Sequence, residues 1–172
     1  MPLKKPNQDG FSLLEVLIAV VVVSVGFLAT ARMQVEGMRS SQSAYFTAQA
    51  TSIMRDMADR MRANPVGVAD GNYRNIETIA GQTLWPACMN AEAECTSTEI
   101  AQADRSSMNR FFYPGPGEEN GFRPALPSSA NITAKAAIDY EAGTNTHTIR
   151  VSWSERVDGD DTEQVISMKV FP

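Results

Sequence analysis

The chain has 172 residues, a length that allows one domain or one domain with an appendage. Apolar residues make up 43% and charged residues 20%, which is ordinary globular composition and excludes wholesale disorder. The 20 acidic residues outnumber the 15 basic ones and give a formal charge of −5, so nucleic acid is not an expected partner. A single His and two Cys leave little material for a metal cage, and we expect no catalytic residue, metal or cofactor.

The largest apolar feature is an N-terminal block, residues 11–31, which reads FSLLEVLIAVVVVSVGFLATA and holds one charged residue, Glu15. As a helix rising about 1.5 Å per residue it would cover roughly 31 Å, enough to cross a hydrocarbon core. The polar leader before it, residues 1–10, carries two lysines, which favour keeping that end in the cytoplasm. A plain single-span anchor and a secretory signal peptide cut after Ala31 are two interpretations of the block.

Glu15 is explained by neither interpretation. An acid at the centre of a membrane helix costs about 2.5–3.5 kcal/mol on insertion scales, and such residues usually have a partner. No Lys, Arg or His lies between Lys5 and Arg32, so the side chains of this segment offer no counter-ion. A cut between Gly10 and Phe11 would supply one, because the new α-amine would lie one helical turn from Glu15.

The run Gly10-Phe11-Ser12-Leu13-Leu14-Glu15, after a short basic leader and before a long apolar stretch, resembles the class III signal of type IV pilins and pseudopilins. The resemblance implies that a membrane-embedded prepilin peptidase cleaves after Gly10 and N-methylates Phe11. It also implies that Glu15 neutralises the Phe11 amine of a neighbouring subunit when the helix joins a filament. Before assembly the chain would be a single-pass inner-membrane protein with its head in the periplasm, and afterwards part of an extracellular pilus.

The N-terminal helix is expected to run from residue 11 to about 63, because no proline interrupts it before Pro65. Its first half, 11–35, would span the membrane and later pack in the filament, and its second half, 36–64, is amphipathic. The apolar positions of the second half share one face at helical spacing: Phe46, Ala50, Ile53, Met54, Met57 and Met61. Its charged residues are expected on the opposite face: Arg55, Asp59, Arg60 and Arg62.

Residues 65–172 form the expected head. The pattern Thr96-Ser97-Thr98-Glu99 fits a capping box and predicts a short helix from 97 to about 112, whereas the segment 65–96 before it shows little period and is predicted to be loop-rich. Alternating apolar side chains then predict three antiparallel strands, over 132–140, 147–153 and 166–170. A long helix packed on such a sheet gives the α+β class, with the type IV pilin fold that the resemblance implies.

Two cysteines, Cys88 and Cys95, lie near the end of the loop-rich segment. In a cytosolic protein they would be reduced thiols, whereas export to an oxidising compartment favours a disulfide. A zinc site would have to recruit His147 and a distant acid, and the spacing is not typical of one.

His147 shares a strand face with apolar residues, so a sheet-packed histidine is favoured. The acidic loop 158–163 does not match an EF-hand, and a solvated turn is favoured there over a calcium site.

Several segments resemble the PilV group of minor pilins. They are Ala44–Pro65, the Cys88/Cys95 pair ahead of Glu99, Ala101 and Asp104, and the late strand ending Ile149-Arg150-Val151-Ser152-Trp153. This resemblance implies a non-enzymatic subunit that helps to initiate type IV pilus assembly at the tip and supports twitching motility and adhesion. Its partners would be prepilin peptidase, other minor pilins, the major pilin and a tip adhesin.

Two alternative functions stay open from the sequence. A pseudopilin of type II secretion uses the same signal and the same long helix. A membrane-anchored periplasmic enzyme or binding protein would keep its N-terminus uncut, or begin near Arg32.

Overall fold

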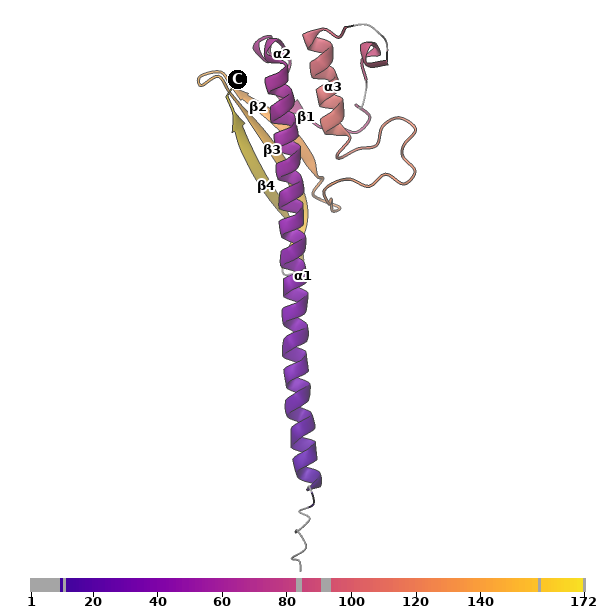
Figure 1. Ribbon diagram of the computed structural model, residues 1–172, viewed down its shortest axis with the longest axis vertical. Coiled ribbons are helices and arrows are strands. Elements are labelled where there is room, and N and C mark those ends of the chain that lie inside the picture. Colours follow the sequence, from indigo (N-terminus) through magenta and orange to yellow (C-terminus); the bar gives the residue numbers. More distant parts are fainter. Residues whose placement is uncertain (1–9, 11, 83–84, 91–93, 158, 172) are drawn as a thin grey trace, which may run out of the picture. The chain divides into compact units, whose positions relative to one another are not determined.

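A computed structural model describes residues 10, 12–82, 85–90, 94–157 and 159–171. The chain divides into two compact units, residues 1–42 and 43–172. The longest helix, α1 (Leu13–Ala63), begins in the first unit and ends in the second (Figure 1). The continuous helix predicted from the absence of proline is therefore confirmed.

The end of α1 is set by Asn64 and Pro65. Asn64 leaves the α region with φ −122° and ψ 63°, as expected for a residue before proline. Pro65 then opens a second helix, α2 (Pro65–Ala69), and the Asn64 side chain caps it by accepting a hydrogen bond from the Gly67 N–H at 3.1 Å. The same two residues thus stop one helix and start another.

The segment 65–96, predicted to be loop-rich, contains more regular structure than expected. Besides α2 it forms a two-residue strand, β1 (Ile76–Glu77), and a 3₁₀ helix, η1 (Ala87–Asn90). Elements of two to five residues are too short to show a hydrophobic period, which is why the sequence pattern did not reveal them.

Helix α3 (Ser97–Asn109) begins as predicted, with a complete capping box. The Thr96 N–H donates to Glu99 Oε2 at 2.9 Å, and the Glu99 N–H donates to Thr96 Oγ1 at 3.3 Å. The helix ends at Asn109, three residues before the predicted end, because Arg110 already serves as its C-cap.

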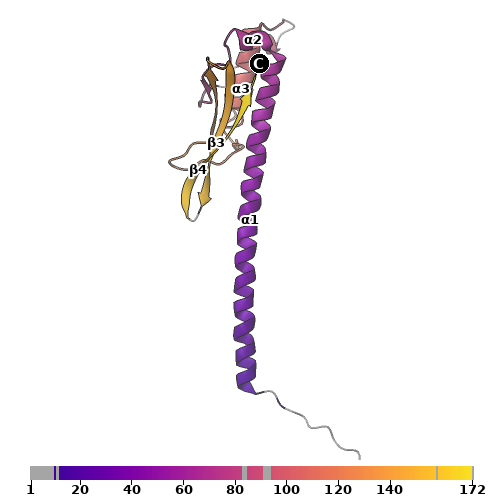
Figure 2. The ribbon, with the colours of Figure 1, turned by 90° about the vertical axis from the view of Figure 1, so that its left-hand side faces the viewer.

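The sheet has four antiparallel strands in the order β1-β2-β3-β4. The three predicted strands are present as β2 (Lys135–Glu141), β3 (Thr146–Val157) and β4 (Asp160–Val170). Figure 2 shows β3 and β4 as a long hairpin. The hairpin is longer than expected because Val157 pairs with Asp160 across a tight turn, in which Gly159 has a φ of +100° that favours glycine.

The core of the second unit lies between the last part of α1 and one face of the sheet. The α1 side chains that it buries include five of the six predicted apolar positions, and Phe46 is half-buried against them. The facing sheet residues are Ala136, Ile138, Ile149, Val151 and Trp153. This helix-on-sheet packing confirms the predicted α+β class.

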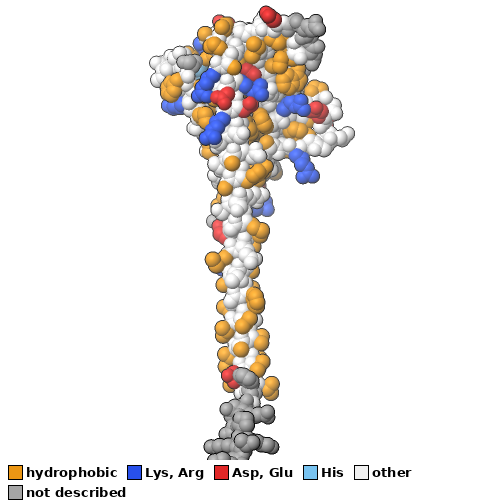
Figure 3. Space-filling model, in the orientation of Figure 1, with side chains coloured by type: hydrophobic (Ala, Val, Ile, Leu, Met, Phe, Trp, Pro, Cys, Tyr) orange, Lys and Arg blue, Asp and Glu red, His pale blue; other side chains and the backbone are white. Residues whose placement is uncertain are grey.

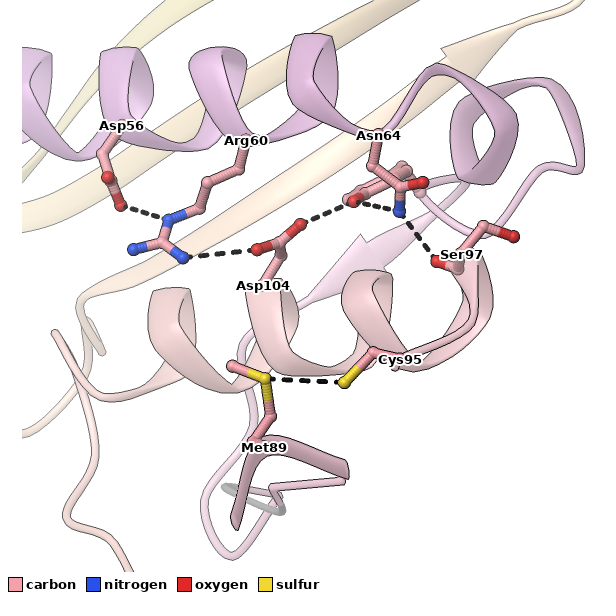
Figure 4. A network of polar contacts seen from close by, with 8 residues as sticks. Asp56, Arg60, Asn64, Met89, Cys95, Ser97 and Asp104 are labelled. Carbon is pink, nitrogen blue, oxygen red and sulfur yellow. Dashed lines mark hydrogen bonds and ion pairs between the residues drawn. The ribbon is translucent and has the colours of Figure 1, made fainter. Parts of the chain in front are cut away.

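A partly buried polar network joins the end of α1 to α3 (Figure 4). Arg60 donates from Nε to Asp56 at 2.9 Å and from Nη1 to Asp104 at 3.3 Å. The Tyr73 hydroxyl donates to the other Asp104 oxygen at 2.6 Å, and Asn64 Nδ2 donates to the Tyr73 oxygen at 3.0 Å. These contacts connect segments that lie up to 44 residues apart in the sequence.

The helical pattern placed Arg60 opposite the apolar face of α1, and the structure adds that this side chain reaches α3. The Arg60 side chain is 38% exposed and bridges two carboxylates. Burial alone would lower its pKa, but the hydrogen bonds to Asp56 and Asp104 outweigh burial and raise it. The pKa of Tyr73 is also raised, by burial first and then by its hydrogen bond to Asp104. Arg60 stays charged and Tyr73 stays a donor.

The substitution Asp104→Asn tests this network. We expect it to lower the free energy of unfolding of the head unit, residues 43–172, by about 1–3 kcal/mol, because Tyr73 and Arg60 lose a buried charged acceptor. Asp59→Asn is the matched control, since Asp59 pairs with Arg62 at the surface, and it should cost no more than about 0.5 kcal/mol. Chemical denaturation of the two variants measures both values, and equal losses would contradict a special role for Asp104.

His147 on β3 is 1% exposed, and neither ring nitrogen has a hydrogen-bond partner among the described residues. Its ring lies 4.9 Å from that of Tyr140, over which the Arg74 guanidinium sits at 4.2 Å. Burial, and then repulsion from Arg74, lower the pKa of His147 below its ordinary value of 6.5. The sheet-packed histidine favoured from the sequence is what the structure shows.

His147 makes the stability of the head unit depend on pH. As the pH falls below about 6.5 the unfolded chain takes up a proton at His147 while the folded chain does not, so the free energy of unfolding falls until the lowered folded pKa is reached. The slope is at most about 1.4 kcal/mol per pH unit, the value for one proton. Since the chain has one His, His147→Leu should flatten the profile between pH 7 and pH 5. Denaturation at stepped pH measures this, and an unchanged slope in the variant would contradict it.

Candidate assembly site

The first turn of α1 is organised by Ser12. Its side-chain oxygen accepts a hydrogen bond from the Leu14 N–H at 3.3 Å, and its carbonyl accepts one from the Glu15 N–H at 3.0 Å. These are the contacts of an N-cap residue. The sequence analysis gave Ser12 no role, although the Ser-x-x-Glu spacing to Glu15 is the signature of a helix start and could have indicated one.

The expected cleavage position lies directly before this cap. Gly10 is exposed, and a Cβ added there would meet no atom within 4 Å. Among the described residues, therefore, none packs closely enough on position 10 to require a glycine there. Phe11, the expected first mature residue and methylation site, lies outside the described residues.

Glu15 is exposed in the first turn of α1. A carboxylate in that position is favoured by the partial positive charge of the helix N-terminus. Among the described residues none forms an ion pair with it. The structure thus brings Gly10, Ser12 and Glu15 together at one helix start and leaves the carboxylate available to a partner outside the chain.

The surface of α1 on the C-terminal side of Glu15 is apolar. Val16, Val20, Val23 and Phe27 lie on the same side of the helix at spacings of three and four residues, and the large apolar side chains of this part of α1 are exposed. Figure 3 shows hydrophobic side chains, in orange, along the lower part of the helix. By length and composition α1 is the one helix of the described residues that could cross a membrane. An apolar surface of this extent needs lipid or other helices to cover it.

The two cysteines lie in the second unit and are disulfide-bonded, with their Cα atoms 5.3 Å apart. The bond ties η1 to the residues just before α3, and Sδ of Met89 lies 3.8 Å from Sγ of Cys95 (Figure 4). Because both sulfurs are used in this bond, the zinc alternative does not fit the structure.

The acidic loop of the head is only partly described, because Asp158 lies outside the described residues. Asp160 and Asp161 begin β4, and Arg156 on β3 lies 3.5 Å from the Asp161 carboxylate. Within the described ranges no group of three or more His, Cys, Asp or Glu side chains is placed to hold a metal ion.

Two family models match the chain, and they meet at the boundary between residues 31 and 32. Residues 5–31 match the prokaryotic N-terminal methylation motif, and residues 32–106 match a family described as type IV pilin Tt1218. No curated protein and no solved structure matches the chain.

These matches carry implications for processing and location. The methylation motif implies processing by prepilin peptidase, and a pilin is a structural subunit that is anchored in the membrane before it assembles into a pilus. The apolar helix that opens the chain, the α+β head that follows it and the two matches agree with one another. The two matches together span residues 5–106 and support a type IV pilin-like family for this chain.

Proposed function

We propose that this pilin is a minor subunit of the type IV pilus, which helps to initiate assembly at the tip and is held there through Glu15. The observation that carries the proposal is that Glu15 is the one charged residue between Ser12 and Ala31 and has no ion-pair partner among the described residues. In this proposal residues 1–10 are the leader, and 11–35 is the segment that first spans the membrane and then packs in the filament.

The partner of Glu15 is the N-methylated amine of Phe11 in a neighbouring subunit. An unpaired carboxylate in hydrocarbon is costly, and pairing it with a cation removes much of that cost. The surrounding surface of Val16, Val20 and Phe27 is apolar, so the ion pair would be the one strongly directional contact there. It would fix the axial register of two helices that otherwise could slide along each other.

The minor-subunit role is supported by the resemblance to the PilV group. The resembling segments include Ala44–Pro65, which supplies the buried face of α1 and three members of the polar network, Asp56, Arg60 and Asn64. They also include Asp104, the acceptor at the centre of that network. The proposed partners are other minor pilins, the major pilin and a tip adhesin. The head would lie in the periplasm before assembly and on the extracellular pilus afterwards, in support of twitching motility and adhesion.

Glu15→Ala tests the assembly role. The variant should still fold and be processed, but its amount in sheared pili should fall at least about tenfold, because loss of the ion pair costs more than about 1.4 kcal/mol in an apolar surrounding. Glu36→Ala is the matched control, since Glu36 is an exposed carboxylate of α1 outside the apolar block, and it should assemble normally. Quantitative blotting of the sheared and membrane fractions gives both ratios.

Pilus number in a deletion strain, with and without the Glu15→Ala chain, tests the tip role. A strain that lacks the chain should make fewer pili, the wild-type chain should restore their number, and the Glu15→Ala chain should not. The wild-type chain should also be far less abundant in sheared pili than the major pilin. Recovery of the Glu15→Ala chain in pili at the wild-type level would overturn the register proposal, and unchanged pilus number in the deletion strain would overturn the priming role.

Intact-mass analysis tests the processing step. The mature chain should begin at Phe11 with one added methyl group in cells that contain prepilin peptidase, and should keep residues 1–10 in cells that lack it. Gly10→Leu should block the cut, whereas Gly37→Leu, at another glycine with open surroundings, should not. A chain that starts after Ala31, or one that keeps its leader in all strains, would contradict the proposal.

A further inference from the structure

β4 forms one edge of the sheet, and within the described part of the chain it pairs with β3 alone (Figure 1). A strand in this position carries a row of backbone N–H and C=O groups that its own sheet leaves unpaired. The opposite edge, β1, has two residues, whereas β4 has 11. β4 is therefore the long edge of this sheet and the one with room for another strand.

The backbone groups that point out of this edge belong to the odd-numbered residues of β4. Ser154 faces Glu163 in the β3–β4 ladder, yet the Ser154 N–H donates to the carbonyl of Pro127, on its other side, at 3.0 Å. The Ser154–Glu163 pair is thus not hydrogen-bonded. Since bonded and non-bonded pairs alternate along an antiparallel ladder, Glu163 and every second residue from it direct their N–H and C=O groups to the free edge.

The side chains of those odd-numbered residues lie on the exposed face of the sheet. Gln164, Ile166, Met168 and Val170 are the more buried residues of β4, and they alternate with exposed ones. Asp161 near one end is acidic and Lys169 near the other is basic, with Val165, 53% exposed, midway between them. If a second β4 is placed antiparallel beside this one, by a half-turn about an axis at Val165, the Asp161 of each strand therefore faces the Lys169 of the other.

We propose that β4 docks antiparallel on the β4 of a second copy of this chain, in the register centred on Val165. In this register Val165 faces Val165, Glu163 faces Ser167 and Asp161 faces Lys169. All of these residues direct their backbone groups to the edge, so each facing pair exchanges hydrogen bonds. The interface is isologous: one edge with an apolar centre and opposite charges at its two ends is complementary to itself. Asp161, which already lies 3.5 Å from Arg156, gains a second cation.

The direction of α1 limits where this contact forms. A half-turn about an axis through the sheet reverses the strands and also the part of α1, residues 43–63, that packs on the sheet. Subunits inserted into one membrane, and then into one filament, have helices that run the same way. The contact therefore joins heads carried by two separate filaments. It does not depend on Glu15 or on the proposed tip role.

Site-specific disulfide formation tests the register with the purified full-length chain in detergent micelles. The described residues hold no free cysteine, so an intermolecular bond formed under a mild oxidant reports the introduced one. Val165→Cys should shift the protein from monomer to disulfide-linked dimer on a non-reducing gel, because facing Cα atoms lie about 5.5 Å apart. Glu163→Cys and Ser167→Cys are the controls. Each alone should stay monomeric, because the introduced cysteine of one copy lies four positions along the strand from the same cysteine of the other copy, a separation of about 14 Å. An equal mixture of the two should give the mixed dimer.

Charge reversal is the second arm of the test. Lys169→Asp in the Val165→Cys chain should lower the dimer yield, and adding Asp161→Lys should restore it. Equal dimer yields from Val165→Cys, Glu163→Cys and Ser167→Cys would overturn the proposal, as would the absence of dimer from both Val165→Cys and the mixture. A yield that does not respond to the charge reversal would overturn the register.

Discussion

An unpaired carboxylate at the start of an otherwise apolar helix is the constraint on which the rest of the molecule depends. The large apolar side chains in the first part of α1 are exposed among the described residues, so this part needs a cover from outside: lipid before assembly, and other helices in a filament. Glu15 is the one charge in this block, so in the assembly that we propose it is the group that distinguishes a correct neighbour from a shifted one. In that proposal the apolar residues supply attraction and the acid fixes the register.

The second part of the same helix meets a different requirement. From Ala50 to Met61 one side of α1 is buried in the core of the head, and at its end Arg60 and Asn64 enter the polar network around Asp104 and Tyr73. A single element therefore serves two environments. Its sequence changes from apolar on all sides to amphipathic where the surrounding changes from membrane or filament to a protein core.

Local patterns in the sequence were sufficient for the elements that are long or strongly marked. The absence of proline predicted α1, the capping box predicted α3, and the alternation of apolar residues predicted β2, β3 and β4. The pattern did not reveal β1, whose two residues become a strand only because β2 lies beside them. It also did not reveal that Arg60 contacts Asp104, because a helical period shows which face is apolar but not which distant segment covers the other side. The N-terminal methylation motif could be predicted because it is contiguous, whereas the buried acid that completes the network lies 44 residues from its arginine.

The position of the disulfide has a mechanical consequence. The Cys88–Cys95 bond closes a ring with a sequence separation of seven, and the ring includes neither α1 nor any of the longer strands. When a filament is pulled, tension enters the head through α1 and passes to the sheet across the buried side chains from Ala50 to Met61. The covalent cross-link lies outside that route. The resistance of the head to traction therefore comes from close packing between α1 and the sheet. Reducing the disulfide would loosen η1 without weakening the packing of the sheet on α1.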